Sequence, residues 1–280
     1  MQARDEVLIT VAELARLIEA GDPPAILDVR WRLDDPDGRA AHLDGHLPGA
    51  VYVSLEDELS DHSVAGRGRH PLPSGRSLEA AARRWGIRHD DAIVVYDDWN
   101  RAGSARAWWV LTAAGLRNVR ILDGGLSAWR SAGHRLESGP VEPAAGNVTV
   151  SQADLYTGDR PTLTAEQIGE VTLLDARAPE RFRGDVEPLD PVAGHIPGAK
   201  NLPSGAVLSD DGTFLGAGAL GQLLADRGID GPVGVYCGSG VTAAITIAAL
   251  AATGRQAALY PGSWSEWCSD PARPVGRGPE

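Results

Sequence analysis

Cysteine is scarce in this chain of 280 residues, which has only Cys237 and Cys268. Two cysteines are too few for a disulfide framework, so the class of small disulfide-stapled proteins is excluded. Positively charged residues are also fewer than negatively charged ones. The chain has 26 Lys and Arg and 38 Asp and Glu, which gives a formal net charge of −12. Such a balance argues against the broad basic face that nucleic-acid binding requires.

Long hydrophobic runs and common cofactor motifs are missing as well. The longest apolar run follows Val241 and is too short to span a bilayer. Residues 1–22 have the pattern of a short strand and an amphipathic helix without a basic leader, so no signal peptide and a cytoplasmic, reducing location are expected. GxGxxG after a strand and clusters of His and Cys ligands are absent. We therefore expect no cofactor, no metal, and neither a nucleic-acid nor a membrane partner.

Four sequence blocks occur twice, in the same order in each half. The first copies are AILDVR (25–30), GHLPGAVYVS (45–54), AIVVYDD (92–98) and LDGGLSAW (122–129). The second copies are TLLDAR (172–177), GHIPGAKNLP (194–203), VGVYCGS (233–239) and YPGSWSEW (260–267). The chain is therefore two copies of one domain. We expect the domains at 1–138 and 162–280, joined by a Gly- and Pro-rich linker at 139–161.

Short β-branched segments alternate with Ala-rich helical segments within each copy. Several of these strands are apolar throughout, which is typical of strands buried on both faces. The pattern predicts an α/β fold in which each half has a central parallel sheet flanked by helices. Ligands in such folds bind beyond the carboxyl ends of the strands, and Cys237 follows a predicted strand at that edge.

The stretch GPVGVYCGSGVTAAITIAAL (231–250) places Cys237 between a strand and a helix. Glycines permit backbone angles at which successive N–H groups point towards one centre, and the helix adds the positive end of its dipole. This environment favours a reactive thiolate, with an inert buried cysteine as the alternative. The loop residues expected to form the binding cradle are Gly238, Gly240, Val241 and Thr242.

Two copies of a domain carrying GHxPGA, with CGSGVTA in the second, closely resemble the tandem-domain rhodanese family of sulfurtransferases. The resemblance covers nearly the whole chain. It implies a rhodanese fold in each half and transfer of a sulfane sulfur through a persulfide on Cys237. The implied partners are a small-molecule sulfur donor and a thiol or cyanide acceptor, and a thioredoxin-like reductant is a further candidate.

The two residues after the cysteine bear on the choice of donor. Thiosulfate-preferring members of the family carry cations there, whereas this chain has Gly238 and Ser239. The loop is similar to that of 3-mercaptopyruvate sulfurtransferases, in which Ser239 would hydrogen-bond the donor carbonyl or relay a proton. The alternatives are a serine that is merely small, a thiosulfate-specific enzyme, and a non-enzymatic persulfide carrier or partner-binding module.

Arginines are expected to hold an α-keto acid donor by its carboxylate, because a guanidinium can bind it through two hydrogen bonds. DARAPERFRG (175–184) supplies candidates, and the resemblance supports Arg177 and Arg181 as donor-binding residues. Arg30 stands at the position equivalent to Arg177, so a structural pairing with Asp175 remains open. The run GRGRH (66–70) has the pattern of a solvated loop, with guidance of an anionic donor as the alternative.

A histidine with an acidic neighbour is implied by the resemblance as the proton partner of Ser239. The histidine of GHLPGA is His46, and Asp35 is the acidic neighbour favoured by spacing. A structural role for His46 stays open because His195 takes the same place in the second half. Asp97 stands where the second half has Cys237, and a carboxylate cannot form a persulfide, so the first half is expected to be non-catalytic.

Overall fold

The computed structural model describes residues 3–279, and its first half is built on a five-stranded sheet. All of its neighbouring strands are parallel, in the order β1-β5-β4-β2-β3. The strands are β1 (Leu8–Ile9), β2 (Ala25–Asp28), β3 (Val51–Tyr52), β4 (Ile93–Tyr96) and β5 (Val119–Leu122). All four residues of β4 are buried, as expected for a strand covered on both faces.

The second half repeats this topology with four strands in the order β7-β6-β8-β9, again all parallel. The strands are β6 (Thr172–Asp175), β7 (Lys200–Asn201), β8 (Val233–Tyr236) and β9 (Ala257–Leu259). An isolated parallel bridge from Thr162 to Leu259 stands where β1 pairs with β5 in the first half. The repeated blocks therefore become equivalent strands, and the α/β fold predicted for each half is confirmed.

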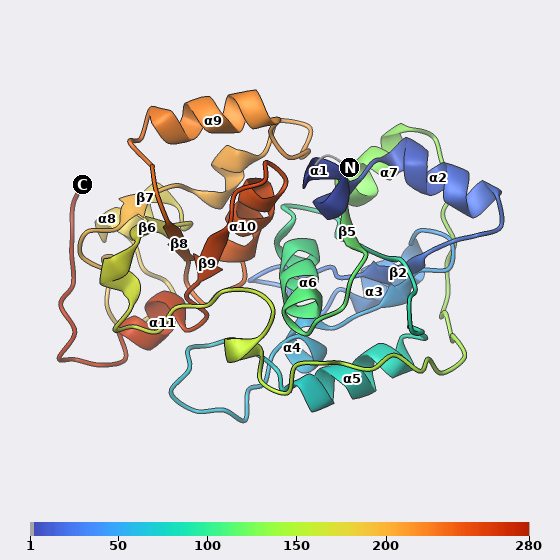
Figure 1. The fold of residues 1–280 in the computed structure, drawn as a ribbon, viewed down its shortest axis with the longest axis horizontal. Coiled ribbons are helices and arrows are strands. Elements are labelled where there is room, and N and C mark those ends of the chain that lie inside the picture. Colours follow the sequence, from blue (N-terminus) through green and yellow to red (C-terminus); the bar gives the residue numbers. More distant parts are fainter. Residues whose placement is uncertain (1–2, 280) are drawn as a thin grey trace.

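Helices cover both sheets, and the two halves lie side by side (Figure 1). Those of the first half are α1 (Ala3–Val7), α2 (Val11–Glu19), α3 (Arg39–Asp44), α4 (Leu55–Glu58), α5 (Gly75–Arg84), α6 (Ala102–Ala113) and α7 (Gly125–Ser131). Those of the second half are α8 (Pro179–Arg183), α9 (Ala217–Ala225), α10 (Ala243–Ala251) and α11 (Ser263–Trp267). Short 3-10 turns lie at η1 (Leu155–Thr157), η2 (Ile168–Glu170) and η3 (Ser204–Val207). No helix among residues 3–279 is both long and apolar enough to cross a bilayer.

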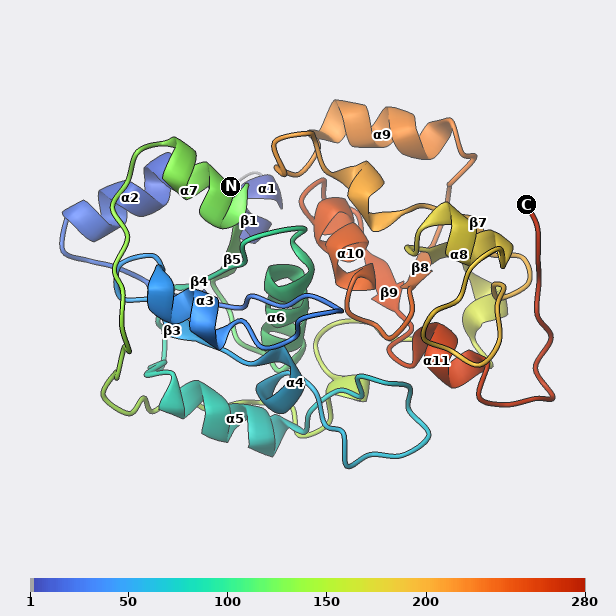
Figure 2. The same cartoon turned by 180° about the vertical axis from the view of Figure 1, so that it is seen from behind.

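Helices α6 and α10 pack against each other at the centre of the molecule, where the halves meet (Figures 1 and 2). Eleven of the twelve residues of α6 and eight of the nine of α10 are buried. Helices that are apolar on every side need burial all round, and their many alanines let the backbones approach. One hydrophobic cluster accordingly runs through both halves, from Val7 to Leu259.

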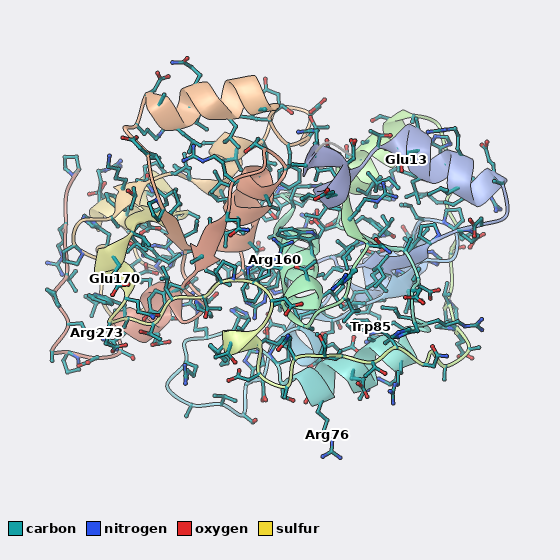
Figure 3. The ribbon with its side chains drawn as sticks, in the orientation of Figure 1. Glu13, Arg76, Trp85, Arg160, Glu170 and Arg273 are labelled. Carbon is teal, nitrogen blue, oxygen red and sulfur yellow. The ribbon has the colours of Figure 1, made fainter. Side chains whose placement is uncertain are left out.

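The segment predicted as linker runs along α5 before it reaches the second half (Figure 2). Gly75 donates a backbone hydrogen bond to Ala153, and the Arg83 side chain donates one to Val148. Near its end, the Arg160 guanidinium lies 4.3 Å from the centre of the Trp108 ring on α6 (Figure 3). This segment therefore packs against the first half along much of its length.

Candidate active site

Cys237 follows β8 directly, at the carboxyl edge of the second sheet, and only 1% of its surface is exposed. The Gly240 backbone N–H donates to the Cys237 sulfur at 3.2 Å. The Cys237 backbone N–H donates to the Ser263 hydroxyl at 3.2 Å. The thiol therefore lies inside a turn of its own loop, with a main-chain donor directed at the sulfur.

The conformation of the loop depends on Gly240 and on its distance from α11. Gly240 has a φ of +79°, and a Cβ there would lie 2.5 Å from the Pro261 carbonyl oxygen. Only glycine combines this left-handed backbone with such a close approach. Val241 is buried in the core, and Thr242 is the N-cap residue of α10. The positive end of α10 therefore follows the loop directly.

Three polar side chains form a hydrogen-bonded series that connects the loop with the first half. The Ser239 hydroxyl lies 2.7 Å from Nδ1 of His70, and Nε2 of His70 lies 3.1 Å from Oε1 of Glu56. The Trp31 indole N–H donates to the same Glu56 oxygen at 2.6 Å. Ser239 and His70 are both buried. This is the order of hydroxyl, imidazole and carboxylate that moves a proton in many enzymes.

The pKa values of His70 and Glu56 suit proton transfer. Burial lowers the pKa of His70 below its ordinary value, although the hydrogen bond to Glu56 opposes the shift. Burial alone would raise the pKa of Glu56, but its hydrogen bonds with His70 and Trp31 outweigh this effect and lower the pKa to about 2. At neutral pH the imidazole is therefore neutral and the carboxylate is charged. A ring that donates its Nε2–H to Glu56 leaves Nδ1 free to accept from Ser239.

A buried cation from the first half, Arg106 on α6, connects the loop to the histidine. Its guanidinium donates to the carbonyl oxygens of Gly240 (3.2 Å), His70 (3.1 Å) and Leu59 (3.1 Å). Burial lowers the pKa of Arg106 to about 10, so it remains charged at neutral pH, and Cys237 is close enough to attract it. Arg106 therefore fixes the loop and adds positive charge near the sulfur.

Two further arginines approach the loop beside Gly238. A Cβ at this position would lie 2.9 Å from Nη2 of Arg69 and 3.6 Å from Nη1 of Arg181. Arg181 is held at 2.6 Å by Glu187, and Arg69 is paired with Asp190. Arg181 from α8 and Arg69 from the GRGRH run therefore both lie beside the residue that follows Cys237.

Arg177 has a different place from the one predicted. Its guanidinium donates to Asp175 at 2.6 Å and to the Gly194 carbonyl oxygen at 2.7 Å, and it lies 4.8 Å from the centre of the Trp264 ring. Burial alone would lower the pKa of Arg177, but Asp175 outweighs this effect and raises it. Arg30 pairs in the same way with Asp28. Arg177 therefore makes the pairing with Asp175 that the repeat left open.

His46 and Asp35 are not brought to Ser239. The ring nitrogens of His46 contact the carbonyl oxygens of Leu47 at 2.9 Å and Gly139 at 3.1 Å. Its backbone pairs with Glu137, and Asp35 is exposed in the loop after β2. The structure therefore places His70, and not His46, beside Ser239, and it places Glu56, and not Asp35, beside that histidine.

Asp97, at the equivalent point in the first half, has its carboxylate surrounded by its own loop. It accepts hydrogen bonds from the backbone N–H of Trp99, Arg101 and Ser104, and from the Ser104 hydroxyl at 2.6 Å. The Arg101 guanidinium lies 3.1 Å away. The carboxylate fills the cradle that holds the sulfur in the second half.

Sequence reasoning did not name Glu56 or Arg106, and it weighed Arg69 and His70 only as part of the run GRGRH. The four blocks in which the halves match contain none of them. His46 and His195 recur and both pair their backbones with a later segment, to Glu137 and Gly276. The signal that the sequence offered for these residues was the histidine of the run GRGRH, which is present in only one half.

Comparison with known proteins shows what this arrangement resembles. The family described as the rhodanese-like domain matches twice, over residues 10–132 and 161–270. A Mycobacterium tuberculosis protein provisionally named thiosulfate sulfurtransferase SseB is 74% identical over 282 residues, which cover 99% of each chain. The 3-mercaptopyruvate sulfurtransferase of Escherichia coli is 36% identical over 270 residues, 92% of this chain and 95% of its own.

The solved structures give a matching result. The crystal structure of SseA from Escherichia coli, presented as a rhodanese-fold 3-mercaptopyruvate enzyme, aligns with a TM-score of 0.80 and 32% identity. The alignment covers 92% of this chain and 98% of SseA. Both halves and the connection between them are therefore similar in the two molecules.

Proposed function

The chain belongs to the rhodanese family of sulfurtransferases, and from this premise we propose that its sulfur donor is 3-mercaptopyruvate. Cys237 takes the sulfur as a persulfide and passes it to a thiol or to cyanide. Gly238, Gly240, Val241 and Thr242 form the cradle around that sulfur, and Arg181 holds the donor carboxylate. The Asp97 half serves as scaffold and supplies side chains to the site.

The observation that carries the choice of donor is the hydrogen-bond chain from Ser239, two residues after Cys237, through His70 to Glu56. Cleaving the carbon–sulfur bond of a mercapto-ketone leaves an enolate, which must be protonated. A proton relay is useful for that step. Thiosulfate releases sulfite, a stable anion that needs no such proton.

The chemistry balances with groups that the site holds. The Cys237 proton passes through the Ser239 hydroxyl to Nδ1 of His70, and Glu56 stabilises the imidazolium. The thiolate attacks the donor sulfur, the S–S bond forms, and the C–S electron pair moves to carbon as the pyruvate enolate. The same relay returns the proton to the enolate, which gives pyruvate and Cys237–S–SH. No net proton is taken up.

The second half-reaction regenerates the cysteine. A thiol acceptor takes the outer sulfur and becomes a persulfide, whereas a cyanide acceptor becomes thiocyanate. Cys237–SH is restored in both cases. A thioredoxin-like dithiol instead becomes a disulfide and releases hydrogen sulfide. These acceptors require that thiols stay reduced, and Cys237 and Cys268 are both free. A cytoplasmic location fits this chemistry.

Thiosulfate is the second candidate donor, favoured by the name of the Mycobacterium tuberculosis relative. Against it, the two loop residues after the cysteine carry no charge, and the two arginines beside Gly238 are already neutralised by Glu187 and Asp190. A doubly charged donor would find little excess positive charge here beyond that of the buried Arg106. A persulfide carrier dedicated to one protein acceptor is the third possibility.

The test is steady-state sulfur transfer to cyanide and to a small thiol, with 3-mercaptopyruvate and thiosulfate as alternative donors. We expect kcat/KM to favour mercaptopyruvate, and Ser239→Ala to lower that value by about 100-fold or more. Ser131→Ala, an exposed serine on α7, is the matched control and should behave as wild type. A preference for thiosulfate would overturn the donor assignment, and no transfer from either would favour the carrier.

A further inference from the structure

A cavity of about 470 Å³ lies where the two halves meet, at the edge of the sheets opposite to Cys237. Its lining includes Val119 and Ala257, the first residues of β5 and β9, whereas Cys237 follows the last residue of β8. The carboxyl-terminal ends of α6 and α10 and residues 159–161 of the connecting segment also line it. We call it the interdomain cavity, and its volume is typical of small-molecule sites.

Arg160 brings a half-buried cation to the interdomain cavity, at the junction of the two halves (Figure 3). Its guanidinium lies over the Trp108 ring, and its Nε donates to the Thr112 hydroxyl at 3.0 Å. Neither Nη1 nor Nη2 of Arg160 makes a hydrogen bond or an ion pair with residues 3–279. Burial lowers the pKa of Arg160. Because a guanidinium that loses water without gaining a counter-charge is destabilised, the two free nitrogens favour an anion.

Arg255 lines the interdomain cavity from the second half, in the loop between α10 and β9. Its side chain makes no ion pair or hydrogen bond within the described part of the chain. Glu6 and Asp159 line the cavity too, but Glu6 is exposed and the Asp159 carboxylate accepts a hydrogen bond from the Gln152 amide at 2.6 Å. Among residues 3–279, no carboxylate therefore pairs with Arg160 or with Arg255.

We propose that the interdomain cavity binds a small organic phosphate monoester through Arg160 and Arg255, and that this ligand holds the two halves together. A phosphate monoester carries about 1.5 to 2 negative charges at pH 7 and three acceptor oxygens. Two guanidinium groups match such a dianion, whereas a monocarboxylate would neutralise only one of them.

The rest of the interdomain cavity suits an organic group attached to the phosphate. The volume exceeds what a phosphate ion alone would fill, and the wall contains the apolar side chains of Val7 and Ile247. Arg160 contacts α6 of the first half through Trp108, whereas Arg255 belongs to the second half. A ligand that both arginines hold therefore bridges the halves. This site is separate from the cysteine loop and does not depend on which sulfur donor is used.

The competing explanation is that these arginines only complement the ends of the helices. The carbonyl groups at the carboxyl end of a helix carry partial negative charge and attract cations, and Arg255 follows α10. In that case, removing either arginine should lower stability, and the cavity should have no affinity for an anion. The two explanations therefore differ in whether a phosphate monoester binds.

The experiment measures binding of phenyl phosphate, inorganic phosphate and phenol to the full chain by isothermal titration calorimetry at constant ionic strength. We expect phenyl phosphate to bind about 10-fold or more tightly than inorganic phosphate, and phenol not to bind. Arg160→Met and Arg255→Met should each weaken phenyl phosphate binding by about 10-fold or more, as for loss of a charged hydrogen bond. Arg160→Lys should keep part of the affinity. Arg76→Met is the control, because Arg76 points away from the body of the molecule (Figure 3).

Thermal unfolding shows whether the variants fold and whether the ligand stabilises the folded chain. A ligand that binds only the folded state raises the unfolding midpoint. Phenyl phosphate should therefore raise the midpoint of wild type and of Arg76→Met. At the same concentration it should leave the midpoint of Arg255→Met nearly unchanged. Arg255→Met should fold, because its side chain makes no hydrogen bond or ion pair among the described residues.

Arg181→Ala distinguishes the interdomain cavity from the cysteine loop, where other cations lie. We expect this variant to bind phenyl phosphate as wild type does. Binding that is lost in Arg181→Ala but kept in Arg255→Met would place the anion beside Cys237 and overturn the inference. No binding of phenyl phosphate to wild type, or equal binding of inorganic phosphate, would also overturn it. None of these results depends on sulfur transfer, so they leave the proposed function to its own test.

Discussion

Cys237 and Asp97 follow equivalent strands, and their surroundings show how much one side chain changes. In the second half the loop donates the Gly240 N–H to sulfur and leaves the neighbouring Gly238 facing two arginines. In the first half the carboxylate accepts three backbone N–H groups of its own loop. The same position therefore holds a thiol in one domain and, in the other, a carboxylate whose hydrogen bonds come from its own loop.

At this scale, the pH dependence of the reaction should report His70. The imidazole must be neutral to accept a proton, and burial lowers its pKa below the ordinary value of 6.5. The rate should therefore stay level as pH falls through 6.5 and decline only at lower pH. Glu56→Gln removes a group that raises the pKa of His70, so the decline should move to still lower pH while the maximal rate drops. Profiles of kcat/KM against pH measure both effects.

The control for this profile is Glu13→Gln, because Glu13 lies on α2 and pairs with Arg120, away from the site (Figure 3). An acid limb above pH 6.5, or one that Glu56→Gln leaves in place, would contradict the assignment of His70 as the proton acceptor.

Arg177 and His46 have equivalents in the other half, and each makes the same kind of contact as its equivalent. Arg177 repeats the pairing of Arg30, and His195, like His46, uses a ring nitrogen to contact a backbone carbonyl. The place of Cys237 between a strand and a helix could be predicted from the sequence. The contact of His70 with Ser239 could not, because spacing along the chain does not say which loop of one domain faces the other.

Among the elements, the loop before α10 determines how the sulfur is held. Gly240 has a positive φ and lies against the Pro261 backbone, so the loop and α11 fit only without a side chain at this position. The strands and helices themselves could be predicted, because apolar strands and Ala-rich helices alternate in the sequence. The five-residue α1 before β1 was not predicted, since helices this short lack a periodic signal.

Gly240→Ala should displace the loop and lower sulfur transfer by about 100-fold, the usual effect of losing one main-chain donor to a developing anion. It should also lower the free energy of unfolding by at least about 1 kcal/mol, because alanine resists the left-handed region. Gly218→Ala is the control: its Cβ would meet nothing within 4 Å in α9, and alanine should stabilise that helix by up to about 1 kcal/mol. Kinetics and urea denaturation measure both variants.

Equal activity of Gly240→Ala and wild type would show that the Gly240 N–H contributes nothing to the reaction. A stability loss without an activity loss would assign the glycine to folding alone.

The molecule as a whole is two domains with one continuous core. The hydrophobic cluster through α6 and α10 spans both halves, and polar contacts such as Arg4 with Asp123 and with the Phe214 carbonyl oxygen reinforce the junction. The site is therefore assembled at a fixed interface, with the sulfur from one half and the proton relay from the other. The duplication could be predicted from the repeats, but the relative placement of the two copies could not.

Arg106 contributes both to the interface between the two halves and to the candidate active site. Arg106→Met keeps much of the side-chain volume but leaves the carbonyl oxygens of Gly240, His70 and Leu59 without their donor. We expect a loss of about 3 kcal/mol or more in the free energy of unfolding, at roughly 1 kcal/mol or more per unpaired group. Sulfur transfer should fall as well, because the buried cation near Cys237 is gone. Urea denaturation with parallel kinetics tests this.

Arg117→Met serves as the control for the loss of charge, because Arg117 is exposed and makes no ion pair among residues 3–279. Unfolding of Arg106→Met at the wild-type urea midpoint would contradict the role of Arg106 at the interface.

Transfer of sulfur through Cys237 is tested most directly by trapping the persulfide intermediate. The protein is incubated with 3-mercaptopyruvate without an acceptor, blocked with an alkylating reagent, cleaved and analysed by mass spectrometry, alongside Cys237→Ser and Cys268→Ser. We predict one extra sulfur atom on the Cys237 peptide in wild type and Cys268→Ser. We predict no persulfide and no turnover in Cys237→Ser, whose unfolding midpoint stays near that of wild type. Extra sulfur on Cys268, or turnover that survives Cys237→Ser, would contradict sulfur transfer through Cys237.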